Sequence, residues 1–279
     1  MVNIDIEGTT DLTTKLTIAT RGIAYVPGSV EWADFDPTAT SNAIAQLDFA
    51  DALPKRELKA MLDTYLKGVR DRISGKMPWK NYTAYEIRII GALVRLGRRD
   101  EANELLDFFL SDRRPNAWNQ WPEITWRDAR SPGHLGDVPH TWVAAEFLLV
   151  IASMVAMERE VGDSLVLAAG LRWDWITGSG FSVKGLPTRY GTLDFSLRAM
   201  GTGTLHVRIG QLKRMPQDGI ILTPPLPDGT QLAGGGQSLV IERLPFRGSL
   251  DLRAHASKSD FNETRRRGVR GEMRRGSGV

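Results

Sequence analysis

Apolar side chains in the first 160 residues recur with the three- to four-residue spacing of amphipathic α-helices. The clearest segment follows Pro54 and is closed by Gly75 and Pro78. Six residues form its single apolar face: Leu58, Met61, Leu62, Tyr65, Leu66 and Val69. This pattern predicts a long helix that packs by one side only.

Two further stripes predict a helical hairpin. The first comprises Tyr85, Ile89, Leu93 and Leu96, and the second comprises Ala102, Leu105, Leu106 and Phe109. Gly97 lies between them and ends the first helix in a tight turn. Helices joined by so short a turn pack antiparallel. A later helix of about twenty residues is expected to begin at Pro139 and to end near Glu160.

The N-terminal segment supports two interpretations. Leu12, Leu16 and Ala19 fit a helix near residues 11–22, whereas the many threonines and the alternation of Leu16 and Ile18 suit a strand. We expect the helix. Asp36 followed by Pro37 then marks a second helix start, with the proline in the first turn.

Near residue 161 the apolar period changes from helical to two, which is typical of strands. Glycine-, proline- and threonine-rich turns separate the short runs. The runs begin at Leu165, Phe181, Leu193, Leu205, Ile220 and Leu239. The runs on either side of Gly201 and Gly203 predict a β-hairpin. Regular short strands of this kind indicate an antiparallel β-sandwich.

Helices first and strands second predict an α+β chain with segregated parts. We expect a helical-hairpin domain over residues 1–160 and an antiparallel β domain over 161–255. Residues 256–279 have almost no core-forming side chain, so we expect a disordered basic tail.

Composition excludes several classes of protein. The chain has no cysteine, which rules out disulfides and thiolate metal sites, and no apolar run long enough to span a bilayer. The first residues lack the features of a signal peptide, and nothing in the sequence indicates a compartment. The net charge of +3 is misleading, because residues 253–279 alone carry +5. A nucleic-acid interaction would rest on the tail, and a solvated terminus is the interpretation we favour.

The most informative stretch is the proline-bounded loop at 115–146, in which three tryptophans surround one carboxylate. These residues are Trp118, Trp121, Trp126 and Glu123. Indole faces stack on the CH surfaces of sugars, and a carboxylate handles protons or hydroxyls. The alternative is that the tryptophans fill the top of a helical core and Glu123 caps a helix.

Other candidate chemistry is sparse. Gly201-Thr-Gly-Thr lacks the third glycine of a dinucleotide loop, and no phosphate-binding loop or nucleophile elbow occurs. His134, Asp137 and His140 are spaced like metal ligands, but Pro139 prevents a shared helical face, and Asp137 is expected to cap the following helix. We therefore expect no metal site and no cofactor. Asp34, Asp36 and Tyr82 are further candidates for a cleft, with helix capping as the alternative for Asp36.

Residues 11–255 resemble the C-terminal half of bacterial six-hairpin, (α/α)6-barrel glycosidase-like proteins of the glucoamylase-like superfamily. Six segments carry the resemblance: Tyr25–Gly28, Asp34–Thr40, Asn81–Glu86, Leu96–Ala102, Leu105–Leu110 and 114–147. The last is the most specific, with Trp121-Pro-Glu-Ile-Thr-Trp126 and Gly136-Asp-Val-Pro-His-Thr-Trp. The resemblance implies that Glu123 corresponds to the general base of such enzymes. It also implies a departure, because a full barrel has six hairpins and this chain has about three, without the half that carries the general acid.

The resulting hypothesis is a carbohydrate-processing protein that forms the C-terminal part of a partial (α/α)6 toroid. Glu123 would act as base in hydrolysis of a glycosidic bond, and Trp118, Trp121 and Trp126 would stack on the sugar or form the wall of the site. The alternative is a non-catalytic carbohydrate-binding or structural fragment. Because two flanks of the partial ring would be uncovered, we expect the isolated chain to be inactive and to associate with itself or with the missing half.

Overall fold

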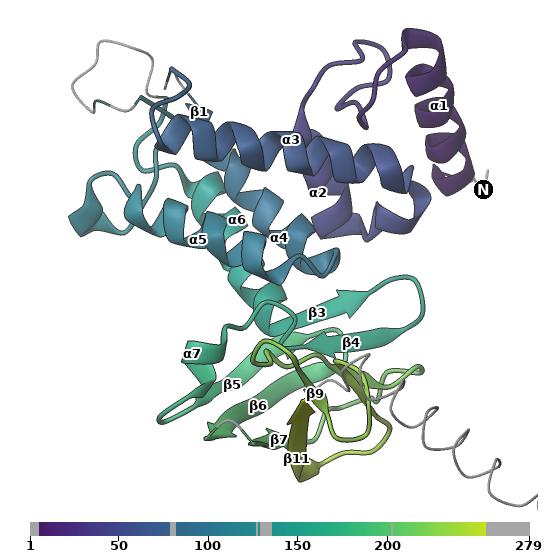
Figure 1. The fold of residues 1–279 in the computed structure, drawn as a ribbon, viewed down its shortest axis with the longest axis vertical. Helices are drawn as coiled ribbons and strands as arrows, with labels where there is room; N and C mark the ends of the chain where they lie inside the picture. The colour runs from purple at the N-terminus through teal and green to yellow at the C-terminus, as the bar shows by residue number, and fades with distance from the viewer. Residues whose placement is uncertain (1–5, 79–81, 127, 129–135, 202, 255–279) are drawn as a thin grey trace, which may run out of the picture.

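The computed structural model describes residues 6–78, 82–126, 128, 136–201 and 203–254, and the predicted tail lies outside the described residues (Figure 1). The chain is an α+β protein in which a helical region precedes two larger β-sheets. Its α-helices are α1 (Ile6–Arg21), α2 (Pro37–Leu47), α3 (Lys55–Ile73), α4 (Arg88–Arg95), α5 (Arg99–Ser111), α6 (Thr141–Val155) and the short α7 (Trp173–Ile176). Short 3₁₀ turns are η1 (Phe49–Ala52), η2 (Ala84–Ile87) and η3 (Asn116–Trp118).

Helix α4 is the centre of the helical region and contacts α2, α5 and α6. All its residues from Ile89 to Val94 are buried, because neighbours cover it on several sides. Gly91 permits the close approach of α2, since a Cβ atom there would lie 3.1 Å from the Cβ of Ala45. The described helices do not close into a ring (Figure 1).

The predicted hairpin is confirmed as α4 and α5. Gly97 has φ +71°, and the following Arg98 N donates to Leu93 O at 2.8 Å, which closes the first helix in the geometry that glycine favours. The helix expected near 11–22 is confirmed as α1, and the helix after Pro54 as α3.

The helix expected from Pro139 to Glu160 is shorter than predicted. Helix α6 ends at Val155, and β3 (Ala156–Arg159) begins at once and pairs antiparallel with β4 (Ser164–Leu167). Four residues are too few to show a period of two, so the apolar pattern placed the change of structure too late. Asp137 does not cap α6, because His140 occupies the cap position and no side chain closes it.

Two sheets form the β region. The first has the order β10-β8-β4-β3 and the second the order β5-β6-β7-β11-β9. The remaining strands are β5 (Phe181–Thr188), β6 (Gly191–Met200), β7 (Thr204–Ile209), β8 (Ile220–Leu222), β9 (Thr230–Leu232), β10 (Leu239–Ile241) and β11 (Phe246–Ala254). The predicted hairpin around Gly201 is confirmed as β6 and β7. The expectation of antiparallel pairing is wrong at one point, where β4 and β8 are parallel.

The four-stranded sheet is the middle layer of the molecule. Val166 of β4 belongs to the helical core, whereas Leu165 and Leu167 belong to the core shared with the five-stranded sheet. Both faces of β4 are therefore covered, which explains its uninterrupted apolar run. Among the residues that the structure describes, no helix has the length and apolar character needed to cross a bilayer.

Candidate functional site

Trp121 fixes the long loop between α5 and α6 to the helical core. Its side chain is only 4% exposed, packs against Phe147 with 4.9 Å between ring centroids, and donates from Nε1 to Phe109 O at 2.8 Å. It therefore has no face available to a ligand. The prediction that Trp121 stacks on a sugar is wrong, and the alternative of a core tryptophan holds for this residue.

The backbone of Glu123, two residues further on, is held from both sides. Its N–H donates to Asp137 O at 3.1 Å, and its carbonyl accepts from Ala84 N at 3.1 Å and from Thr83 Oγ1 at 3.0 Å. The adjoining β1 (Tyr82–Thr83) and β2 (Ile124–Thr125) pair antiparallel. The half-buried Glu123 carboxylate makes no hydrogen bond or ion pair with any residue that the structure describes.

Glu123 faces a hollow of about 470 Å³ at the ends of helices α2 and α6. Eight residues line it: Asp36, Thr38, Ala39, Thr83, Tyr85, Arg88, Glu123 and Trp142. The structure thus brings two of the predicted site residues, Asp36 and Glu123, to one concave surface. Trp142 is 60% exposed there and offers the aromatic face that Trp121 does not.

Asp36 also has the capping role that its sequence position suggested. Its Oδ1 accepts from Thr38 N at 2.9 Å and from Ala39 N at 3.2 Å, at the start of α2. Asp34 lies away from the lining of the hollow, is exposed, and accepts from Ser29 N at 3.0 Å to close its own loop.

Tyr85 connects the hollow to a histidine. Its Oη lies 2.5 Å from His140 Nε2, and His140 Nδ1 lies 3.9 Å from Asp137 Oδ2. Burial raises the pKa of Tyr85, and the negative charge of Glu123 raises it further, so the phenol keeps its proton at neutral pH. Tyrosine and histidine therefore form a hydrogen-bonded pair beside Glu123, and Asp137 lies close to the histidine without a hydrogen bond to it.

A buried ion pair supports the wall of the hollow beneath Trp142. Arg88 Nη2 donates to Glu146 Oε1 at 2.8 Å, and Trp142 Nε1 donates to the same oxygen at 3.3 Å. Arg88 Nε and Glu146 Oε2 are buried and have no hydrogen-bond partner among the residues that the structure describes. The ion pair therefore holds the Trp142 ring in place through Glu146, and one nitrogen and one oxygen of the pair remain without a hydrogen bond to the described residues.

The remaining predicted residues lie elsewhere. Trp118 is 64% exposed on η3 and does not line the hollow, and neither does the half-buried Trp126, whose carbonyl accepts from Arg114 Nη1. Tyr82 pairs through its backbone with Thr125. His134, of the suggested metal spacing, lies outside the described residues, and His140 contacts Tyr85.

Sequence reasoning missed Tyr85, Arg88, His140 and Trp142 as members of this site. In the sequence, Tyr85 and Trp142 look like core residues of amphipathic helices. The one local signal that could have identified them as site residues is their position in the first turn of a helical segment, directly after a loop that contains proline. Arg88 and Glu146 are 58 residues apart, so their pairing is visible only in three dimensions.

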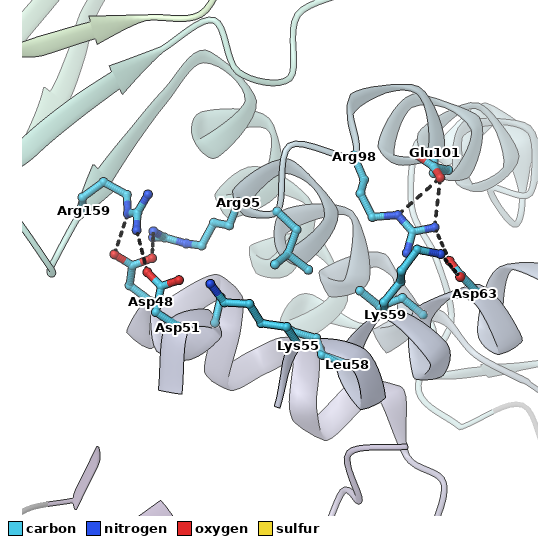
Figure 2. A pocket seen from close by; sticks show the side chains of 13 residues that line it. Asp48, Asp51, Lys55, Leu58, Lys59, Asp63, Arg95, Arg98, Glu101 and Arg159 are labelled. Atoms are coloured by element: carbon cyan, nitrogen blue, oxygen red, sulfur yellow. Dashed lines mark hydrogen bonds and ion pairs between the residues drawn. The ribbon is translucent and has the colours of Figure 1, made fainter. Parts of the chain in front are cut away.

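A second hollow, of about 640 Å³, is filled with charges that neutralise one another (Figure 2). On one side Asp48 accepts from Arg159 Nε at 2.8 Å and pairs with Arg95 at 3.1 Å. On the other side Arg98 and Lys59 share Asp63. Burial lowers the pKa of Arg95, and Asp48 opposes that shift. This network ties η1, α4 and β3 together, and we assign it a structural role.

Comparison with protein-family models, with curated proteins and with solved structures gave no match for this chain. Its function must therefore be argued from the site itself.

Proposed function

We propose that the chain is a carbohydrate-processing protein whose sugar site is the hollow at Glu123. The observation that carries this proposal is the free Glu123 carboxylate beside Asp36, the Tyr85 phenol and the exposed indole of Trp142. An aromatic face next to several hydrogen-bonding groups suits the alternating CH and OH surfaces of a sugar.

In this proposal Glu123 acts as general base and takes a proton from the attacking water in hydrolysis of a glycosidic bond, while a general acid contributed by the rest of the proposed toroid gives a proton to the departing oxygen. The Tyr85 and His140 pair relays protons at the edge of the site. Arg88 fixes the wall, and Trp142 stacks on a sugar ring. The resemblance to six-hairpin glycosidase-like proteins supports the role of Glu123.

The helical region is, in the same proposal, part of a larger helical toroid, and the outer face of α6 is where that toroid continues. Helix α6 carries a single charged residue, Glu146, which is buried and paired with Arg88. Its outer face exposes Trp142, Leu148 and Leu149. A helix apolar on all sides normally packs on all sides. Further helical hairpins on this face would also close the hollow, because Trp142 belongs to both.

The second candidate is a carbohydrate-binding protein without catalysis. One observation favours it: the other carboxylate of the hollow, Asp36, is committed to two backbone N–H groups of α2. A carboxylate held in this way accepts hydrogen bonds from sugar hydroxyls but is poorly placed to donate a proton.

Titration with neutral oligosaccharides tests whether the hollow at Glu123 is the sugar site, and assays with chromogenic glycosides test whether the chain hydrolyses glycosidic bonds. Trp142→Ala should weaken sugar binding. Turnover by the chain alone that falls about 10²–10⁴-fold in Glu123→Gln, while sugar still binds, would show a catalytic Glu123 and overturn the expectation that the isolated chain is inactive. Glu31→Gln, at an exposed glutamate outside the hollow, is the control. Binding without turnover would favour the second candidate. If Trp142→Ala left sugar binding unchanged, the hollow at Glu123 could not be the sugar site of either candidate, the hydrolase or the non-catalytic binding protein.

A further inference from the structure

The unpaired basic side chains of the β region gather on the outer face of the five-stranded sheet. In the helical region, arginines such as Arg70, Arg72 and Arg88 form ion pairs. By contrast, five exposed cations on the strands of this sheet make no ion pair or side-chain hydrogen bond within the described chain: Lys184, Arg198, Arg208, Arg247 and Arg253.

Strand register places two of these arginines directly opposite each other. Arg208 of β7 is the cross-strand partner of Arg247 of β11, and the same row continues through Ser196 of β6 to Ser182 of β5. Like charges at directly opposed positions destabilise a sheet. A counter-ion that bridges the two guanidinium groups would remove this repulsion.

The row lines a hollow of about 570 Å³ together with eight further residues: Val183, Lys184, Asp194, Phe195, Ile209, Gly210, Pro245 and Phe246. Asp194 is the single carboxylate among the lining residues; its Oδ1 accepts from Gly185 N at 2.8 Å and it forms no ion pair within the described chain, so three cations face one anion in the hollow. Since neighbouring strands lie about 4.8 Å apart, the four side chains of the row extend over about 14 Å. This is the length of a short oligosaccharide rather than of a single inorganic anion.

We propose that this hollow, defined by Ser182, Ser196, Arg208 and Arg247, binds an acidic oligosaccharide that carries carboxylate groups. The arginines pair with the carboxylates, for which the planar guanidinium is well suited, and the serines bond to hydroxyls. The inference rests on the proposed function in taking the ligand to be a carbohydrate, and it adds a second, acid-specific subsite on the β region.

The direction of the aromatic side chains argues against a nucleic acid on this face. Single-stranded nucleic acids bind sheets through exposed aromatic rings on which bases stack. Of the phenylalanines of these strands, Phe195 is buried in the core between the sheets, and Phe181 and Phe246 are partly buried against that core, so that Phe246 reaches the hollow only at its edge. The outer row offers hydroxyl and guanidinium groups without a stacking platform.

The test measures binding of a fluorescent oligogalacturonate to the full chain by anisotropy. Arg208→Gln/Arg247→Gln should weaken binding about tenfold or more for each lost charge-assisted pair. The matched control, Arg21→Gln/Lys76→Gln, removes the same charge at two exposed cations of the helical region, outside the lining of the hollow, and should leave binding unchanged. Both double variants keep the same basic segment at 255–279, so any binding to that segment contributes equally to both and does not affect the comparison between them.

Equal losses in the two double variants, or no loss in either, would overturn the proposal. Tighter, arginine-dependent binding of single-stranded RNA or of phosphatidylserine vesicles would also overturn it, because the occupant would then be another macromolecule. Folding is checked by thermal unfolding, where Arg208→Gln/Arg247→Gln should melt no lower and up to about 2 °C higher, since repulsion is relieved. Glu123→Gln should not alter this binding, so failure here is distinguishable from failure at the Glu123 site.

Discussion

Gly136 determines where the Glu123 carboxylate can lie. A Cβ atom at position 136 would be 2.5 Å from Glu123 Oε2 and 2.7 Å from its Cβ, and the residue has φ +62°. The glycine therefore serves two purposes, because it adopts a left-handed conformation and leaves space for the catalytic candidate.

Gly136→Ala should destabilise the protein more than Gly97→Ala. Both changes place a methyl group at positive φ, which costs about 1–2 kcal/mol, but Gly97 has no atom within 4 Å of the new methyl. Displacing Glu123 should add about 1–3 kcal/mol and weaken sugar binding. Urea unfolding measures the difference. Equal costs for the two variants would show that Glu123 does not need this space.

At the scale of single residues, sequence analysis identified part of the site. It selected Glu123 and Asp36, which line one hollow, because their polarity and proline neighbours are local signals. It could not assign the tryptophans, because an indole suits a core and a sugar site equally well. Only burial separates Trp121, at 4% exposed, from Trp142, at 60%.

Among the elements, α6 carries the sharpest contrast between its two faces. Met154 is fully buried, whereas Leu148 on the opposite face is 67% exposed. Met154→Ala should therefore lower the free energy of unfolding by about 2–5 kcal/mol, because it opens a cavity. Leu148→Ala should change it by no more than about 0.5 kcal/mol.

Denaturant unfolding at low protein concentration, together with light scattering, measures both effects. If the outer face of α6 is a contact surface, Leu148→Ala should also reduce association at high concentration. A large cost of Leu148→Ala in a dilute monomer would mean that another part of the same chain covers this face.

The helices could be predicted from the sequence because each shows its 3.6-residue period over several turns. Strands β3, β9 and β11 could not. Met157 in β3 and Leu232 in β9 are the single large apolar side chains of their strands, so no apolar run marks either strand, and Gly248 interrupts the apolar alternation of β11. The parallel pairing of β4 with β8 joins residues more than 50 positions apart and leaves no local signal.

In the whole molecule, Arg99 connects the helical and β parts. Its guanidinium donates to four carbonyls, those of Ala168, Ala169, Thr223 and Pro224, at 2.7–3.3 Å. Burial lowers its pKa, and no carboxylate of the described residues pairs with it. The arginine therefore satisfies backbone groups at the junction of two layers.

Arg99→Met keeps the aliphatic packing and removes these bonds. We expect it to lower the free energy of unfolding by about 2–4 kcal/mol, because several carbonyls lose their donors. Calorimetry should show two transitions where the parent protein shows one. Arg172→Met, which removes partly exposed ion pairs with Asp107 and Asp174, should cost less than about 1 kcal/mol. Similar costs for both variants would contradict a coupling role for Arg99.

The parallel pairing of β4 and β8 sets the order in which the chain can fold during synthesis. When β4 leaves the ribosome, β3 has already been made and can pair with one of its edges. The backbone groups of its other edge have no partner until β8 (Ile220–Leu222) has been made. During that interval a strand with three consecutive apolar residues, Leu165–Leu167, has an unsatisfied edge, which is the condition under which nascent chains pair with one another. The hairpin of β6 and β7 forms from local contacts in the meantime. Slow translation between residues 168 and 219 would lengthen the exposure of β4, and a chaperone that covers short apolar strands would shorten it.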